Sequence, residues 1–367
     1  MATLWQRLTN RVEETRAVQP TVPSRAATYA TPELALSLTA VYRAVQIIAT
    51  PISKMELKTF RYATGMEMQI ENPILVNKPS LLDNRRDFIF QTVVALGLEG
   101  NAFWLKSYST SGGVNNLTLL PGSAVSVQYA DSNDISKGVV YFYEGRKYSQ
   151  NDVEHLKLFS RAGYLRGLSP IETCNRDIAS ALDLRDYAAN WFSAAGVPTG
   201  ILTTNQMLNT ADAETITATW HNKQQNRQVA VLGNGFDYKA IALSPRDALF
   251  TDIQEQAVRS IARLYGVPSR LLLTSVPGSS DTYTNVQDEN QVFYRHTLMA
   301  YTDAITDALS NCLPRGTRVE FDFEHLFKAD VAARYDYYKV GIDAGFLTPQ
   351  MVQDKEGLLG KETNAGN

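Results

Sequence analysis

Residues that could perform acid–base or metal chemistry are few in this chain, and their spacing is unfavourable for both. The four histidines are His155, His221, His296 and His325. No two of them have the His-x3-His or His-Glu-x2-His spacing that sets two imidazoles on one helical face to bind zinc. The sequence therefore predicts no metal centre and no cofactor.

His155 stands in an alternating segment, residues 153–158, that predicts a strand. A single histidine in such a position is most often half-buried and bonded to a backbone group, which is our expectation here. The alternative is a lone general acid or base. No carboxylate or nucleophile stands at an informative spacing from it.

Two short strings come near known catalytic motifs and fail on spacing. Residues 357–363, Gly-Leu-Leu-Gly-Lys-Glu-Thr, lack the spacing by which a P-loop wraps backbone amides around phosphate. Residues 167–170, Gly-Leu-Ser-Pro, lack the closing glycine of a nucleophile elbow. Neither nucleotide binding nor a hydrolase is supported.

Acidic pairs are the remaining source of chemistry. Asp322 and Glu324 form one pair; Asp183 and Asp186, three residues apart, would share a helical face. Paired carboxylates can serve glycoside hydrolysis or two-metal catalysis. The nearby Arg185 favours a solvated or interface-facing stripe instead. The sequence therefore predicts that the chain is not an enzyme.

Composition indicates a folded, intracellular protein. The chain has 367 residues, 44% hydrophobic and 20% charged, which is ordinary for roughly two to three globular domains. A net charge of -3 argues against a tight nucleic-acid binder. Cys174 and Cys312, the only cysteines, suit a reducing compartment. We expect no signal peptide and no membrane span.

The first half predicts an α+β domain with a mainly antiparallel sheet over residues 31–165. Residues 1–30 are expected to be a flexible arm. Thr31 caps a helix with Pro32 at its first position, and Pro51 stops it. A further helix and five strands follow from periodicity and turn signals: helix 86–97 and strands 55–62, 102–108, 125–129, 139–143 and 153–158.

The second half predicts two long helices that flank a small module. Ser169-Pro170 opens a helix to residue 195, with an apolar face of Ile171, Cys174, Ile178 and Leu182. The second helix covers 245–265, with Ile253, Ala257, Ile261 and Leu264 on one stripe. Neighbours in the chain usually pack together, so we expect an antiparallel pair. The module between them is predicted as strand 199–203, helix 209–225, strand 228–232, turn 233–235 and strand 236–243.

The last third predicts a loop and more helix. Residues 274–281 have loop chemistry only. A helix over 285–311 carries Leu298, Tyr301, Ile305 and Leu309 on one face. A strand over 318–323 then precedes a C-terminal helical segment with Tyr335, Tyr337 and Tyr338.

Six segments stand out when they are taken together in chain order. They are VYRAVQIIA at 41–49, EGNAF at 99–103, VEHL at 153–156 with YLRGLSPI at 164–171, WFSAAGVPTGIL at 191–202, IARLYGVP at 261–268 with LL at 271–272 and DTYTNV at 281–286, and GFLT at 345–348. In this order they resemble the phage portal family found in long-tailed siphophages and gene transfer agents. A departure follows GFLT, where the family often has an acidic residue and an arginine and this chain has Gln350, Met351 and Val352.

The resemblance implies a portal-protein fold with named parts. They are a mixed wing (31–165, with a strand at 317–325), stem helices (169–195 and 245–266), a small α/β clip (197–244), a tunnel loop (270–284), a long kinked helix (285–311) and a helical crown (326–367).

The same resemblance implies a dodecameric ring at the capsid vertex of a virion, assembled in the host cytoplasm. Double-stranded DNA would pass through it during packaging and ejection, and the terminase large subunit, head–tail adaptors and major capsid protein or scaffold would bind it. The tunnel-loop residues expected near DNA are Ser279, Ser280, Asp281, Thr282 and Tyr283. Those expected to form the stem surface are Asp183, Asp186, Arg259 and Arg263.

Two other classes of protein stay open on the sequence. One is another ring-forming head–tail connector, although such proteins are typically far shorter and lack a stalk with an inserted head. The other is an enzyme of unrecognised type. Rings with a central hole would favour a portal, and a compact monomer with turnover would favour an enzyme.

Overall fold

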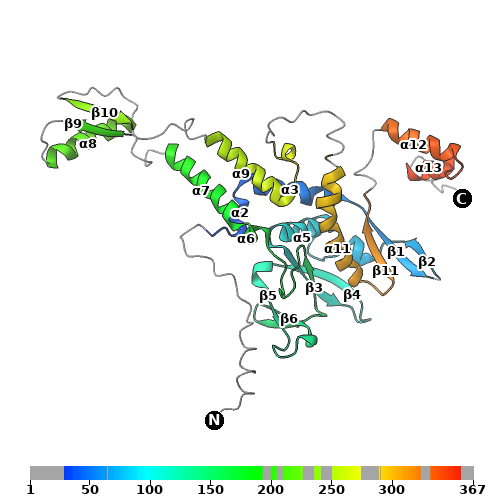
Figure 1. Ribbon diagram of the computed structural model, residues 1–367. Helices are drawn as coiled ribbons and strands as arrows, with labels where there is room; N and C mark the ends of the chain where they lie inside the picture. The colour runs from blue at the N-terminus through cyan, green and yellow to red at the C-terminus, as the bar shows by residue number, and fades with distance from the viewer. Residues whose placement is uncertain are drawn as a thin grey trace, which may run out of the picture.

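The computed structural model places a mixed helical and β body at the centre of the chain, from which a pair of helices projects (Figure 1). A small β–α–β unit lies beyond the far end of this pair, and two short helices lie at the opposite side of the body. The structure describes residues 29–63, 65–192, 200–204, 210–225, 235–240, 250–273, 289, 291–323 and 331–356.

The N-terminal helix is broken into two pieces, α2 (Pro32–Leu36) and α3 (Thr39–Lys54). Thr31 caps α2 through its side chain, as predicted. Ser37 ends α2 by bonding back to the carbonyl of Leu34. The prediction that Pro51 stops the helix is wrong: Pro51 lies inside α3, where its missing N–H removes one bond and the helix continues to Lys54.

The buried core forms where α3 packs against α5 (Arg85–Glu99) and against α9 (Phe250–Tyr265). Asn84 caps α5 by accepting from the Asp87 N–H at 2.9 Å. Gly100 ends it in the left-handed conformation, φ 68°. The helical spacing of Leu34, Leu38, Val41, Val45 and Ile48 predicts one apolar face. The last four are buried, so the pattern correctly identified the core side of α3, whereas Leu34 in α2 is 41% exposed.

Three small antiparallel sheets replace the single sheet predicted for residues 31–165. Strands β2, β4 and β7 were not predicted, because each is partly or wholly exposed and lacks clean alternation. The sheets are β11–β1–β2 (Thr317–Phe321, Leu57–Ala63, Met66–Ile70), β4–β3–β8 (Val114–Leu120, Asn101–Tyr108, Val153–Lys157) and β5–β6–β7 (Ser126–Tyr129, Val139–Tyr143, Arg146–Ser149).

Strand β11, predicted over 318–323, returns the chain to its first sheet. It pairs antiparallel with β1, with Thr59 opposite Val319. Lys58 and Asp322 extend the pairing with an ion pair of 2.8 Å. Segments more than two hundred residues apart thus form one sheet, which ties the C-terminal third to the start of the body.

The long helix predicted over 285–311 has a π-helical turn, Tyr294–Leu298, directly before α11 (Met299–Asn311). Leu298, Tyr301, Ile305 and Leu309 are all buried, as predicted. A π turn adds a residue to the turn and is a common cause of a helix kink. Residues 285–288 and 290 lie outside the described part of the chain.

The projecting pair consists of α7 (Asn175–Phe192) and α9 (Phe250–Tyr265), which lie side by side (Figure 1). The first helix is not continuous from Ser169: α6 (Pro170–Thr173) ends at Cys174, which has non-helical backbone angles. Ile178, Leu182 and Ile261 are buried, whereas Ile253 is 50% exposed and departs from the predicted stripe. Residues 193–195 and 245–249 lie outside the described residues.

The module beyond the pair contains β9 (Gly200–Thr204), α8 (Thr210–Gln225) and β10 (Phe236–Ala240). Strands β9 and β10 pair antiparallel, with Leu202 opposite Tyr238. The strand predicted at 228–232 and most of the turn at 233–235 lie outside the described residues.

The C-terminal helical segment is α12 (Val331–Asp343) followed by α13 (Pro349–Lys355). Tyr338 is buried and donates from its hydroxyl to Glu356 Oε1 at 2.8 Å.

The remaining short helices are α4 (Ile74–Asn77) and the 3-10 turns η1 (Gly122–Ala124), η2 (Ile135–Lys137) and η3 (Ser269–Leu272). Within the described residues, no helix combines the length and the apolar character needed to cross a membrane.

Candidate functional site

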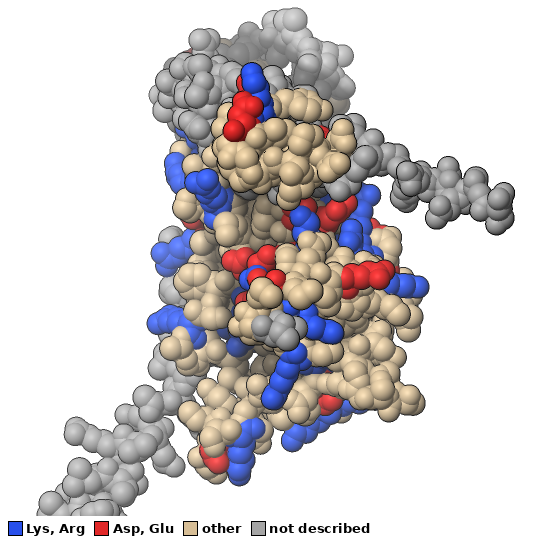
Figure 2. Space-filling model, turned by 90° about the vertical axis from the view of Figure 1, so that its right-hand side faces the viewer, with Lys and Arg blue, Asp and Glu red and all other residues tan. Residues whose placement is uncertain are grey.

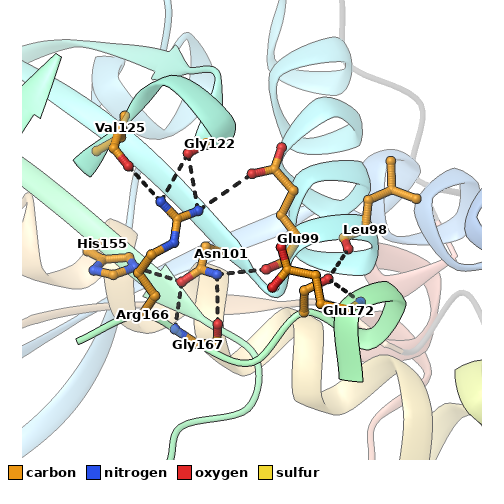
Figure 3. A network of polar contacts seen from close by, with 10 residues as sticks. Leu98, Glu99, Asn101, Gly122, Val125, His155, Arg166, Gly167 and Glu172 are labelled. Carbon is orange, nitrogen blue, oxygen red and sulfur yellow. Dashed lines mark hydrogen bonds and ion pairs between the residues drawn. The ribbon is translucent and has the colours of Figure 1, made fainter. Parts of the chain in front are cut away.

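A buried polar junction fixes the base of the projecting helix pair to the body (Figure 3). It joins the end of α5, strands β3 and β8, and the segment that leads into α6. These are the segments EGNAF, VEHL and YLRGLSPI, which lie far apart in the sequence. We define the junction as Glu99, Gly100, Asn101, His155, Arg166, Gly167 and Ser169.

Asn101 is the centre of the junction and is only 1% exposed. Its amide nitrogen donates to the carbonyls of Glu99 (2.6 Å) and Gly167 (2.9 Å). Its Oδ1 accepts from the Gly167 N–H (2.7 Å) and contacts His155 Nε2 at 3.0 Å. These contacts use the full hydrogen-bonding capacity of the amide. One side chain therefore connects the end of α5, strand β8 and the segment that leads into α6.

His155 acts here as a neutral donor. Burial, with smaller contributions from the nearby cations Lys157 and Arg166, lowers its pKa to about 3. Because Asn101 Oδ1 can only accept, the proton of the imidazole lies on Nε2. The ring stacks on Phe103 with centroids 4.2 Å apart. The predicted backbone partner is wrong, since the partner is the Asn101 side chain.

Arg166 links the junction to the turn before β5. Its guanidinium donates to the carbonyls of Val125 (2.6 Å) and Gly122 (3.1 Å) and lies 3.7 Å from the Glu99 carboxylate. It also lies over the ring of Phe103, at 5.2 Å. Burial raises the pKa of Glu99, and Arg166 opposes that rise.

Two glycines permit the close approach of backbones at the junction. A Cβ on Gly100 would lie 2.1 Å from the Leu168 carbonyl oxygen, and one on Gly167 would lie 2.5 Å from the Gly100 carbonyl oxygen. Ser169 then donates to the Leu98 carbonyl at 2.8 Å and caps α6 through the Glu172 N–H. The start of the helix pair is therefore held against the end of α5.

The four residues predicted for the stem surface are not gathered into one site. Asp183 and Asp186 are exposed on α7, and the Asp186 carboxylate accepts from Arg185 at 3.1 Å. Arg259 pairs with Glu255 of its own helix at 3.0 Å, and Arg263 is exposed. Two of the four residues, Asp186 and Arg259, thus form ion pairs within their own helices.

Only one member of the second acidic pair lies among the described residues. Asp322 is 9% exposed and paired with Lys58, whereas Glu324 lies outside the described residues. Among the described residues, no group of three or more potential metal ligands comes together. The face shown in Figure 2 carries basic and acidic side chains interspersed.

A hollow of about 500 Å³ lies between the end of α9 and residues 289–297. We call it the basic hollow; its lining includes Arg259, Arg263, Glu289, His296 and Thr297. Thr297 donates from its hydroxyl to the Gly266 carbonyl at 2.8 Å, and Gly266 has φ 62°. The π turn is thereby fixed to the end of α9.

Arg270, the first residue of the segment predicted as the tunnel loop, forms an ion pair of 2.5 Å with Glu289, which follows that segment. The tunnel-loop residues expected near DNA lie outside the described part of the chain: Ser279, Ser280, Asp281, Thr282 and Tyr283.

Sequence reasoning missed the roles of Asn101, Arg166 and the Arg270–Glu289 pair. The available signal was the Gly100-Asn101 step directly after an apolar helix.

Comparison with known proteins gives a consistent picture. A family model described as phage portal protein matches residues 39–357. The portal protein of Enterobacteria phage HK97 is 25% identical over 335 residues, covering 86% of this chain and 77% of that protein. A crystal structure of an HK97 family phage portal protein from Corynebacterium diphtheriae has a TM-score of 0.61 and 16% identity, covering 82% of this chain and 98% of that one. The neck of a native gene transfer agent particle, determined with C12 symmetry, has a TM-score of 0.57 and 20% identity, with coverages of 90% and 94%.

Proposed function

The chain belongs to the phage portal protein family, and from this premise we propose that copies of it close into a ring, expected to be a dodecamer, through which double-stranded DNA enters and leaves a capsid. The observation that carries the proposal is the match of the family model to residues 39–357, together with a fold similar to that of solved portal proteins. The twelvefold neck of a gene transfer agent particle supports the expected symmetry.

The parts of the proposed portal map onto the described elements. The body formed by α2 to β8 with β11 would be the wing, and α6, α7 and α9 would be the stem. The β9–α8–β10 module would be the clip, and α12 with α13 the crown. In this arrangement the helix pair is one segment of a channel wall, and the junction at Asn101 sets the angle at which it leaves the wing.

A wall that DNA slides past should not bind phosphate strongly. Helix α7 and the short α6 carry more acids than arginines, with Glu172, Asp177, Asp183 and Asp186 against Arg176 and Arg185. Strong DNA binders instead have a large surplus of Lys and Arg, because affinity comes from neutralising phosphates. The net negative charge of α6 and α7 therefore favours passage of DNA over its retention.

The partners follow from the same proposal. The clip would face the terminase large subunit during packaging and head–tail adaptors afterwards, and the wing and crown would contact the major capsid protein or scaffold. The ring would occupy the portal vertex of a virion after assembly in the host cytoplasm. The chain would be structural, with ATP hydrolysis performed by the terminase.

The proposed tunnel loop provides a direct test of DNA passage. Shortening residues 279–283 should leave rings and capsids intact but reduce packaged DNA, because Thr282 and Tyr283 would lie at the narrowest part of the bore. Capsids made with the shortened chain would be counted by electron microscopy and their DNA quantified after nuclease treatment. Normal DNA content would contradict the assignment of this loop to the bore.

A further inference from the structure

The hairpin formed by α12 and α13 buries too little surface to hold its own shape. Its helices have 13 and 7 residues, and helices shorter than about 12–15 residues are marginal in water unless they pack against another surface. Among its residues whose burial the structure describes, only Tyr338 and Gly341 are buried. Figure 1 shows the hairpin to one side of the body, and within the described residues neither helix packs extensively against a body element. The hairpin therefore needs a further surface.

Helix α12 has an exposed apolar face in addition to the buried one. Tyr337, Val340 and Ala344 follow one another at spacings of three and four, which places them on one side of the helix. All three are exposed, Tyr337 by 61% and Val340 by 63%. We call these three residues the crown stripe. The buried Tyr338 and Gly341 lie about 100° further around the helix, so the crown stripe is separate from the face that the rest of the hairpin covers.

The third side of α12 is charged. It carries Asp336, Lys339 and Asp343, all of which are exposed. Charged side chains are well solvated, whereas an exposed stripe of large apolar side chains marks a surface that meets another protein. Binding to nucleic acid would need positive charges that the crown stripe lacks. The crown stripe therefore fits a protein surface.

The α13 side of the hairpin carries a second apolar surface. Phe346 is 62% exposed and Met351 is 55% exposed. The turn that carries Phe346 closes over α12 at Gly341, where a Cβ would lie 2.5 Å from Leu347 Cδ1 and 3.1 Å from Phe346 Cε2. Phe346 in this turn and Met351 on α13 thus form a surface distinct from the crown stripe.

A second copy of the chain is the partner that these two surfaces fit. The proposed ring repeats the hairpin around its axis, so each hairpin has an identical one on either side. Contacts built by rotation are heterologous, which means that one surface of a copy meets a different surface of the next. The hairpin presents two such surfaces. The portal family model extends to residue 357, which includes the hairpin in the shared fold.

We infer that the crown stripe of one copy packs against Phe346 and Met351 of its neighbour, so that the hairpins form a closed collar on the ring. The inference rests on the proposed ring and names the contact that orders the crown. Assembly then supplies the apolar burial that the single chain lacks. The helices of the hairpin should therefore be stable in rings and open readily in single copies.

Cross-linking between two differently substituted chains tests the contact. One chain carries Val340→Cys and the other carries Met351→Cys, and rings assembled from an equimolar mixture are treated with a short bismaleimide. Covalent dimers should form at least about fivefold faster than in rings that combine Lys339→Cys with Met351→Cys, because proximity raises the effective concentration of the two thiols and Lys339 lies on the charged side of α12. The wild-type chain, with Cys174 and Cys312, gives the background. Equal rates for the two mixtures would overturn the contact.

Amide hydrogen exchange separates a contact between copies from cover within one chain. Residues 331–356 should exchange at least about tenfold more slowly in rings than in single copies, because only the ring completes the hairpin. Val340→Asn should remove most of this protection in the rings that form. Lys339→Asn, which introduces the same residue one position away, should keep it.

The exchange results also separate the inference from its premise. Equal protection in single copies and in rings would show that residues of the same chain cover the crown stripe, and would overturn the inference. Equally rapid exchange in both would overturn it as well, because nothing would then cover the stripe. Both results leave the ring proposal intact, since wild-type rings are present in each. A wild-type chain that forms no ring would instead remove the premise, and the inference with it.

Discussion

The junction lies where the chain enters α6, and the basic hollow lies at the end of α9. The two regions differ in how fully the chain satisfies their polar groups. At the junction, the buried Asn101 amide uses its whole hydrogen-bonding capacity within the chain. At the hollow, Arg263 has no ion-pair partner and the Arg259 Nε–H has no acceptor among the described residues. Buried polar groups without partners are costly. The difference indicates that folding satisfies the polar groups of the junction, whereas the described residues leave polar groups of the hollow without partners.

The largest effect should come from removing the centre of the junction. Asn101→Leu leaves two carbonyls, one N–H and the His155 Nε2–H without partners, and all of them are buried or half-buried. We expect the free energy of unfolding to fall by about 3–5 kcal/mol, as for other losses of a buried polar network. Urea denaturation measures it, with Asn115→Leu at an exposed site of β4 as control. A loss below about 1 kcal/mol would contradict the role given to Asn101.

A smaller effect should appear in the pH dependence of stability. The pKa of His155 is about 3 in the folded chain, against about 6.5 when unfolded. The unfolded chain therefore binds more protons between these values, so stability is complete above pH 6.5 and decreases as the pH falls toward 3. His155→Gln should flatten this slope in denaturation curves taken between pH 7 and pH 4.

The comparison of the wild-type chain with His155→Gln also accounts for the charged groups near the imidazole. Lys157 and Arg166 are the cations that face the ring. Glu99 has a raised pKa and contributes the opposite slope, stabilising at low pH and less as pH rises. Lys157, Arg166 and Glu99 are present in the wild-type chain and in His155→Gln. The difference between the two stability curves therefore isolates the contribution of His155. Identical slopes would show that the imidazole is not held neutral.

The smallest effect on folding should come from the hollow. Arg263→Gln removes an exposed charge that no described residue pairs with, so the free energy of unfolding should change by no more than about 0.5 kcal/mol. Urea denaturation of Arg263→Gln beside the wild-type chain measures this change. A loss of more than about 1 kcal/mol would show that the folded chain already pairs Arg263 and would contradict the distinction between the two regions.

Local sequence signals predicted the parts of the structure that depend on neighbouring residues. The caps at Thr31 and Ser169 and the buried faces of α3 and α11 were correct, because caps and period-3.6 patterns act within one or two turns. The break at Cys174 and the helix through Pro51 were missed. In both places packing against other elements overrides the local preference.

The junction could not be assembled from sequence because its bonds are long-range. Asn101 bonds to His155 and Gly167, which are 54 and 66 residues away. Partners so far apart leave no periodic pattern in the sequence. Only the order of the segments that resemble the portal family related these residues to one another. The three separate sheets were missed for a related reason: β2 and β7 are exposed edge strands without alternating apolar residues.

The central claim is that copies of this chain close around a hole with α7 and α9 in its wall. Cryo-electron microscopy of the purified full-length chain tests it most directly. We predict closed rings in which every copy presents this helix pair to the bore. Particles that hold a single copy at every concentration, with α7 and α9 packed inside it, would contradict the account.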